Sequence, residues 1–77
     1  MNIGKEVMLL KRRFPDRDLI GYWLRGDNVI INTRLKESSE MLSESAQFMV
    51  NSRGDIFGVN PVLYDLSMTN MIPLQKR

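Results

Sequence analysis

Neither cysteine nor histidine occurs among the 77 residues of this chain. Without cysteine the fold contains no disulfide bond, and without either residue type it has no thiolate or imidazole ligands for a metal ion. The commonest general base and the strongest common nucleophile of enzymes are missing for the same reason. We therefore predict that the chain is not an enzyme and that it has no catalytic residues, no metal site and no cofactor.

A long apolar segment is also absent. A membrane-spanning helix needs about 20 consecutive apolar residues, whereas the apolar patch of residues 7–10 is short and is followed by three basic residues. A secretory signal has its basic residues before the apolar stretch, so the order found here does not fit one. Together with the missing cysteines, this order predicts a cytoplasmic protein without a membrane partner.

The formal net charge is only +2, but the charge is unevenly distributed along the chain. Residues 1–36 hold eight Lys or Arg and four Asp or Glu, a net charge of +4. Residues 37–77 hold three Lys or Arg and five Asp or Glu, a net charge of −2. The basic half is suited to a phosphate backbone, to an acidic protein, or to the acidic half of a second copy.

Residues 2–14 have the pattern of an amphipathic helix. Asn2 is a suitable N-cap residue, and Pro15 disfavours helical geometry at the residue before it. Apolar residues recur at the three- and four-residue spacing of one buried stripe, namely Ile3, Val7, Leu10 and Phe14. We expect this stripe to pack against a sheet.

The same helix carries candidate contact residues outside its buried stripe. Lys11, Arg12 and Arg13 occupy the last turn, where cations complement the negative end of the helix dipole and are also available to an anionic partner. Met8 and Leu9 lie beside the stripe and are expected to be exposed. They are interpreted either as ordinary exposed apolar side chains or as a contact surface for another subunit.

Two β-hairpins follow the helix. Residues 19–25 and 29–35 read as strands joined by a short polar turn. Residues 46–61 contain two short apolar runs on either side of a turn, in which Gly54 supplies a positive φ. Turn residues therefore divide the middle of the chain into four predicted strands.

The strand of residues 19–25 has an unusual composition. Strict alternation places Leu19, Gly21 and Trp23 on one face, and the residues between them are apolar too. Two apolar faces predict a central strand or one that is covered on both sides. A glycine inside a strand indicates a bulge or a close approach, here by the helix.

The tripeptide Arg-Gly-Asp occurs twice, at residues 25–27 and 53–55. It fits an internal duplication, an adhesion motif that binds through its cation and its carboxylate, or the ordinary need of a hairpin turn for Gly and Asp. Both copies fall where a hairpin needs these residues, so we favour the turn interpretation.

Three segments have weaker patterns. Residues 36–45 are rich in Ser and Glu and read as a connecting loop with at most one helical turn. In residues 61–66, Pro61 follows Asn60 as in the first turn of a helix, although alternating apolar residues also fit a strand. We predict a short helical segment there, and we expect residues 69–77 to fray.

These patterns together predict one small α+β domain over residues 1–77. The N-terminal helix packs on a four-stranded antiparallel sheet built from the two hairpins, in two layers. A chain of this length buries only about 60% of the surface that it exposes when unfolded, so a second subunit would add stability. The predicted core consists of the helix stripe together with Trp23, Ile31, Phe48, Val50, Ile56 and Val59.

The predicted function is that of a protein-interaction module, which binds a protein partner or a second copy of itself. Six methionines supply adaptable apolar surface for such contacts. The alternative is a nucleic-acid-binding accessory protein, in which the basic helix contacts phosphates and an aromatic side chain stacks on a base. The candidate binding residues are Met8, Leu9, Lys11, Arg12, Arg13, Arg17, Tyr22 and Trp23.

Overall fold

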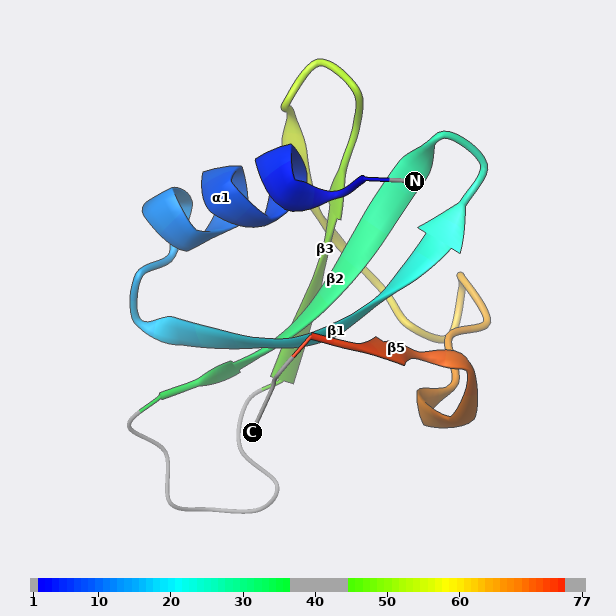
Figure 1. Cartoon of the computed structure of the whole chain (residues 1–77). Coiled ribbons are helices and arrows are strands. Elements are labelled where there is room, and N and C mark those ends of the chain that lie inside the picture. Colours follow the sequence, from blue (N-terminus) through cyan, green and yellow to red (C-terminus); the bar gives the residue numbers. More distant parts are fainter. Residues whose placement is uncertain (1, 37–44, 75–77) are drawn as a thin grey trace.

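A computed structural model describes residues 2–36 and 45–74 of the chain (Figure 1). It has one α-helix and an open antiparallel sheet, which confirms the predicted α+β class. The elements in chain order are α1 (Gly4–Arg13), β1 (Arg17–Arg25), β2 (Asn28–Leu35), β3 (Ser45–Val50), β4 (Ile56–Val59), the short 3-10 helix η1 (Met68–Asn70) and β5 (Ile72–Pro73).

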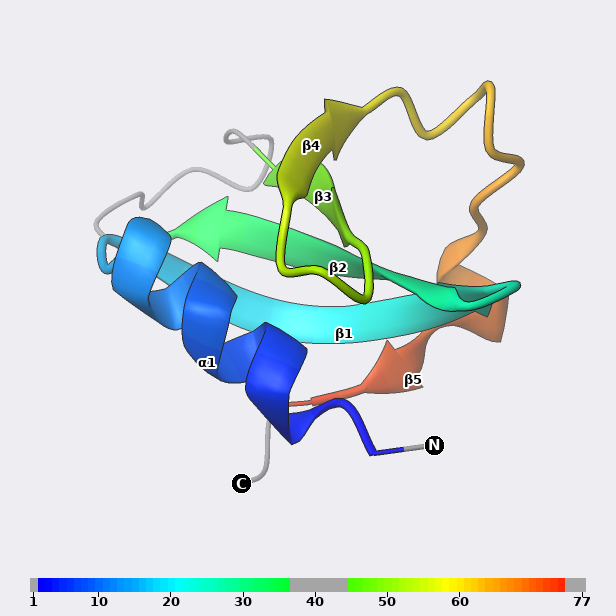
Figure 2. The same cartoon turned by 90° about the horizontal axis from the view of Figure 1, so that it is seen from above.

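The sheet has five strands in the order β4-β3-β2-β1-β5 rather than the predicted four. Figure 2 shows β4 at one margin and β5 at the other. In β5, Ile72 lies opposite Tyr22 and Pro73 opposite Gly21, and the Leu74 N–H donates a 2.9 Å hydrogen bond to Ile20 O. The prediction that residues 69–77 fray is therefore wrong for residues 69–74, where η1 and β5 form, while residues 75–77 lie outside the described residues.

A bulge in β1 changes which side chains share a face. The pairing of β1 with β2 shifts between Leu19 and Gly21, as the glycine predicted. Leu19 is opposite Thr33 and Tyr22 is opposite Ile31, so both point to the same side of the sheet. The strict alternation predicted for this strand is wrong, because the extra residue at the bulge reverses the faces from Gly21 onward.

The close approach at Gly21 is made by the C-terminal segment and not by the helix. A Cβ added to Gly21 would lie 2.6 Å from the Cγ and Sδ atoms of Met71 and 2.8 Å from Ile72 O. Real Cβ atoms essentially never come so close to another heavy atom. Glycine at this position is therefore what allows β5 to lie beside β1.

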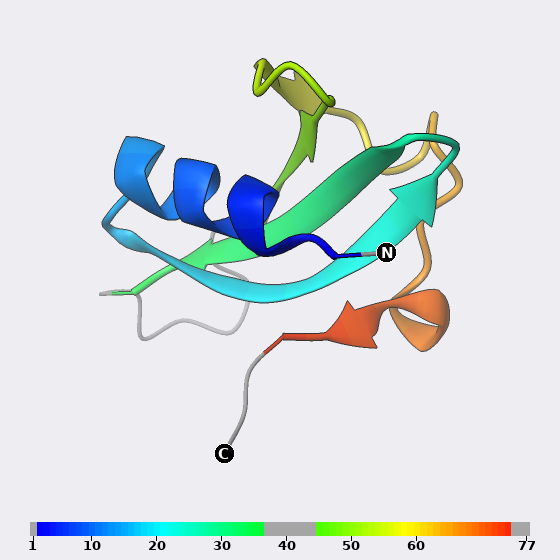
Figure 3. The ribbon, with the colours of Figure 1, turned by 45° about the horizontal axis from the view of Figure 1, so that its top comes forward.

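One face of the sheet forms the main core with the helix, and Figure 3 shows α1 lying along this side. Leu10 is completely buried and Ile3 nearly so, but Val7 and Phe14 of the predicted stripe are only half-buried. The Phe14 ring stacks on Phe48 with centroids 4.6 Å apart, which ties the end of α1 to β3. The buried apolar cluster consists of Ile3, Leu10, Leu19, Val29, Ile31 and Val50.

The opposite face of the sheet is covered by the C-terminal segment. Trp23 and Ile30 are buried there, so Trp23 belongs to the core as predicted, but on the side of the sheet that the helix does not cover. The Trp23 indole Nε1–H donates to Ser67 O at 2.9 Å, and the Asn32 amide donates to the sulfur of Met71 at 3.6 Å. Residues on both sides of η1 thus pack against the sheet, which accounts for the two apolar faces of β1 and departs from the predicted two layers.

The helix and the C-terminal loop begin differently from the predictions. Ile3, not Asn2, occupies the N-cap position, and the Asn2 side chain instead accepts a 2.9 Å hydrogen bond from the Gly4 N–H.

The predicted helix at residues 61–66 is wrong, since the segment forms successive turns. The Asn60 side chain closes the first turn by accepting the Val62 N–H at 2.8 Å. Most of the predicted connecting loop, residues 37–44, lies outside the described residues.

Candidate functional site

The predicted cations gather at the C-terminal end of α1. Lys11, Arg12 and Arg13 are exposed in its last turn, and Lys36 at the end of β2 is exposed as well. An open cleft of about 480 Å³ lies at this end of the molecule. Its lining residues are Lys11, Pro15, Arg17, Asp18, Leu19, Lys36 and Leu74. The cleft brings three cations and one carboxylate together.

Two of the arginines contact the aromatic pair at this end of the core. The Arg17 guanidinium donates a 3.1 Å hydrogen bond to the fully buried Thr33 Oγ1 and lies 5.9 Å from the centroid of the Phe48 ring. The Arg13 guanidinium lies 5.7 Å from the centroid of the Phe14 ring. Cations in this position are attracted by the aromatic face. Arg17 therefore has a structural role, whereas Arg12 lies over no aromatic ring of the described residues.

The structure does not bring the predicted aromatic residues to the cations. Tyr22 is half-buried and packs against the core on the helix side. Trp23 is buried on the opposite side, 3% exposed, with its N–H bonded to Ser67. Arg25 lies by the C-terminal turns, where it donates to Tyr64 O and Asp65 O at 3.4 Å each. The nucleic-acid hypothesis needs a stacking ring beside the basic residues. Neither Tyr22 nor Trp23 lies in that position.

The two predicted apolar contact residues of the helix are in different environments. Met8 is 53% exposed, as expected. Leu9 is half-buried, packs against the core cluster, and reaches across to the β3–β4 turn, where its Cδ1 would lie 3.3 Å from a Cβ on Gly54. The helix therefore presents one exposed apolar side chain of the pair instead of two.

Further exposed apolar side chains, which the sequence reasoning missed, come from the C-terminal part of the chain. We call the following side chains the C-terminal apolar residues: Phe57, Val62, Leu63, Tyr64, Met68 and Ile72. They make up six of the eight large hydrophobic side chains that are exposed in the described ranges 2–36 and 45–74. Val62 and Leu63 are 83% and 80% exposed. The sequence signal for their exposure was their position directly after Asn60-Pro61, which marks a turn. A turn does not bury one side of its chain in the way that a helix or a strand does.

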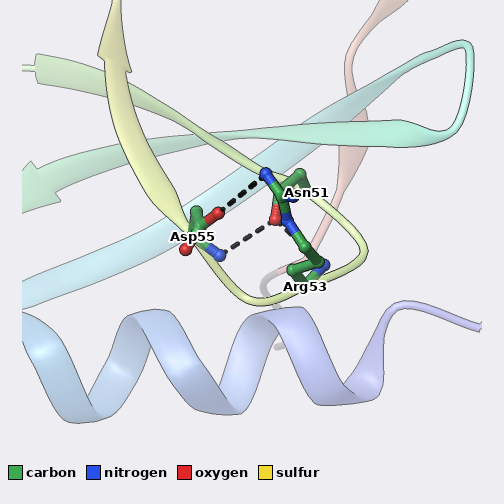
Figure 4. Close-up of polar contacts among 3 residues, drawn as sticks. All are labelled: Asn51, Arg53 and Asp55. Carbon is green, nitrogen blue, oxygen red and sulfur yellow. Dashed lines mark hydrogen bonds and ion pairs between the residues drawn. The ribbon is translucent and has the colours of Figure 1, made fainter.

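The second Arg-Gly-Asp tripeptide forms a closed loop between β3 and β4 (Figure 4). Asn51 Oδ1 accepts the N–H groups of Arg53 and Asp55, both at 2.9 Å, and its amide donates to the Asp55 carboxylate at 3.2 Å. The Arg53 guanidinium lies 3.3 Å from the same carboxylate. Gly54 has φ of 89°, which confirms the predicted positive φ. The cation and the carboxylate face each other within the loop, which favours the turn interpretation over adhesion.

The described residues contain no helix that is both long and apolar enough to cross a membrane. Within residues 2–36 and 45–74, no three carboxylates come together in a group that could hold a metal ion. The chain matches no known family model, and no significant relative is found among curated proteins or solved structures.

Proposed function

We propose that this chain is a non-enzymatic protein-interaction module of the cytoplasm, and that the exposed turn at Val62 and Leu63 supplies the contact surface. The observation that carries the proposal is the exposure of two adjacent aliphatic side chains, Val62 and Leu63, at 83% and 80%. Apolar surface gains about 25 cal/mol per Å² when it is removed from water. A partner that covers these side chains would recover that free energy.

The backbone that presents these two residues is already ordered. Asn60 Oδ1 accepts the Val62 N–H at 2.8 Å, and the Leu66 N–H donates to Pro61 O at 3.0 Å. A loop held in its bound shape loses little conformational entropy on association. The segment is therefore better suited to recognition than an unrestrained apolar loop would be.

The exposed cations fit the same function. Lys11, Arg12 and Lys36 lie at the opposite end of β1 from Arg25 and the turns that it contacts. Basic groups away from the apolar contact accelerate the approach of an acidic protein and set its orientation. The predicted stacking residues Tyr22 and Trp23, by contrast, are not beside these cations, so a nucleic-acid interface has less support.

Affinity capture tests the proposal. The tagged chain is immobilised in native lysate at low salt, with and without nuclease, and compared with Leu63→Glu and with the control Met8→Glu. Both substitutions place a carboxylate on an exposed apolar position, 80% and 53% exposed respectively. We expect nuclease-resistant protein partners that are lost with Leu63→Glu and kept with Met8→Glu.

Two other outcomes would contradict the proposal. Partners that disappear on nuclease treatment and depend on Arg12 and Arg13 would support the nucleic-acid alternative instead. Capture that is equal for Leu63→Glu and the unchanged chain would show that the exposed turn is not the contact surface.

A further inference from the structure

The outer side of β4 carries backbone N–H and C=O groups that no strand of the described residues binds. The Asn51 N–H donates to Asp55 O at 3.1 Å, so the backbone of Asp55 faces β3. In an antiparallel ladder, facing residues alternate between bonded and non-bonded pairs. The backbones of Phe57 and Val59 therefore also face β3, and those of Ile56 and Gly58 face outward. Among the residues that the structure describes, no strand pairs with this side of β4 (Figure 2).

The two margins of the sheet differ in how they are protected. In β5, the Leu74 N–H points inward to Ile20 O, so the preceding residue faces outward, and that residue is Pro73, which has no N–H. In β4, Ile56–Val59 contains neither a charged residue nor a proline. Natural proteins use both devices to prevent strand pairing between molecules. Their absence from β4 leaves this margin open.

We propose that β4 pairs with β4 of a second copy of this chain, antiparallel and centred on Phe57. This arrangement places Ile56 of each copy opposite Gly58 of the other. Each of these two pairs can exchange both of its hydrogen bonds, because the outward groups belong to these residues. A two-fold axis perpendicular to the sheet then relates the copies and gives one continuous sheet with both helices on the same side.

The side chains of β4 are complementary to themselves in this register. Phe57 is 46% exposed and would face Phe57 of the second copy in a non-bonded pair, the closer of the two pair types. A Cβ on Gly58 would meet nothing within 4 Å, so the space beside it is open to the Ile56 side chain of the second copy. No charged side chain of residues 56–59 opposes the contact.

This inference rests on the proposed function as a protein-interaction module and names one of its partners. Light scattering over a concentration series measures the association. We expect the mass to rise from 9.0 kDa toward twice that value in the unchanged chain. Phe57→Lys should hold it at 9.0 kDa, because a lysine in an edge strand resists pairing. The matched control Met8→Lys, at a similarly exposed position, should associate like the unchanged chain, and circular dichroism shows whether each variant is folded.

Disulfide trapping tests the register, and the chain suits it because it has no cysteine of its own. Residues directly opposite in a non-bonded pair have Cα atoms about 4.5 Å apart, within the range that a disulfide spans. Oxidised Phe57→Cys should therefore form a covalent dimer much faster than Met8→Cys, whose position is similarly exposed.

Equal rates of crosslinking, or a mass that stays at 9.0 kDa up to the solubility limit, would overturn the β4 dimer. Failure of this inference is distinguishable from failure of the proposed function. A monomeric chain whose lysate partners depend on Leu63 would still be an interaction module, with a different partner.

Discussion

The indole Nε1 of Trp23 lies 2.9 Å from the carbonyl oxygen of Ser67, 44 residues further along the chain. Trp23 belongs to β1, which lies between β2 and β5 in the sheet, and Ser67 precedes η1. The hydrogen bond therefore fastens the C-terminal segment to the face of the sheet that the helix does not cover. Residues 67–74 are part of the folded structure, and the exposed residues 62–64 are presented between two anchored ends.

Replacing Trp23 with Phe should lower the free energy of unfolding by about 1–3 kcal/mol, through the lost hydrogen bond and the smaller ring in a buried position. Urea unfolding followed by circular dichroism measures this change, since the substitution removes the chain's one tryptophan fluorophore. Tyr22→Phe is the control, because Tyr22 is half-buried and its hydroxyl has no hydrogen bond among the described residues. An equal effect of both substitutions would contradict a specific role for the Ser67 contact.

Gly21→Ala should separate β5 from β1. The new Cβ would lie 2.8 Å from Ile72 O, a backbone atom that cannot move without displacing the strand. Overpacking of this kind costs about 1–3 kcal/mol. We expect a loss of that size in unfolding experiments, and faster hydrogen exchange at the Leu74 amide, which donates to Ile20 O.

Gly58→Ala is the matched control for Gly21→Ala. Gly58 is also in a strand, but a Cβ there would meet no atom within 4 Å, and its φ is not positive. An alanine in place of glycine restricts the unfolded chain, so we expect no change or a gain of up to about 1 kcal/mol. A loss at Gly58 as large as the loss at Gly21 would show that strand geometry, and not the contact with β5, explains the effect.

The helix and the first four strands could be predicted because each has a regular pattern and is bounded by turn residues. The apolar spacing of Ile3, Val7 and Leu10 indicates the helix, and Gly26 and Gly54 mark the two hairpin turns, where both adopt positive φ. The sequence pattern could not predict which face of the sheet each side chain of β1 occupies. The bulge near Ile20 adds one residue to the strand, and this moves Trp23 to the far side of the sheet.

The fifth strand and the apolar turn were missed for a related reason. Proline reads as a strand breaker, yet Pro73 is compatible with an edge strand because its nitrogen faces away from β1. Val62 and Leu63 read as members of a buried element because they are apolar, but the side chain of Asn60 closes a turn around them. Lys11 and Arg17 of the cleft were predicted from the sequence, whereas Lys36 and the exposed apolar residues required the tertiary structure.

Arg17 and Arg12 should differ in their effect on stability although both are basic residues at the same end of the molecule. Arg17 bonds to buried Thr33 and lies over Phe48, so Arg17→Met should cost about 1 kcal/mol in unfolding free energy. Arg12 is exposed in the last turn of α1, and Arg12→Met should change stability by less than about 0.5 kcal/mol. Equal losses would contradict the structural role of Arg17.

Asn51 should contribute more to the β3–β4 hairpin than the ion pair beside it. Its side-chain oxygen satisfies two backbone N–H groups at 2.9 Å, so Asn51→Ala should lower the free energy of unfolding by about 1–2 kcal/mol. The Arg53–Asp55 pair is 3.3 Å long, but its side chains are 79% and 51% exposed, and exposed pairs contribute about 0–1 kcal/mol. Arg53→Ala should therefore have a small effect, which decreases further with added salt. A larger loss from Arg53→Ala than from Asn51→Ala would mean that the charges, and not the asparagine, hold the loop closed.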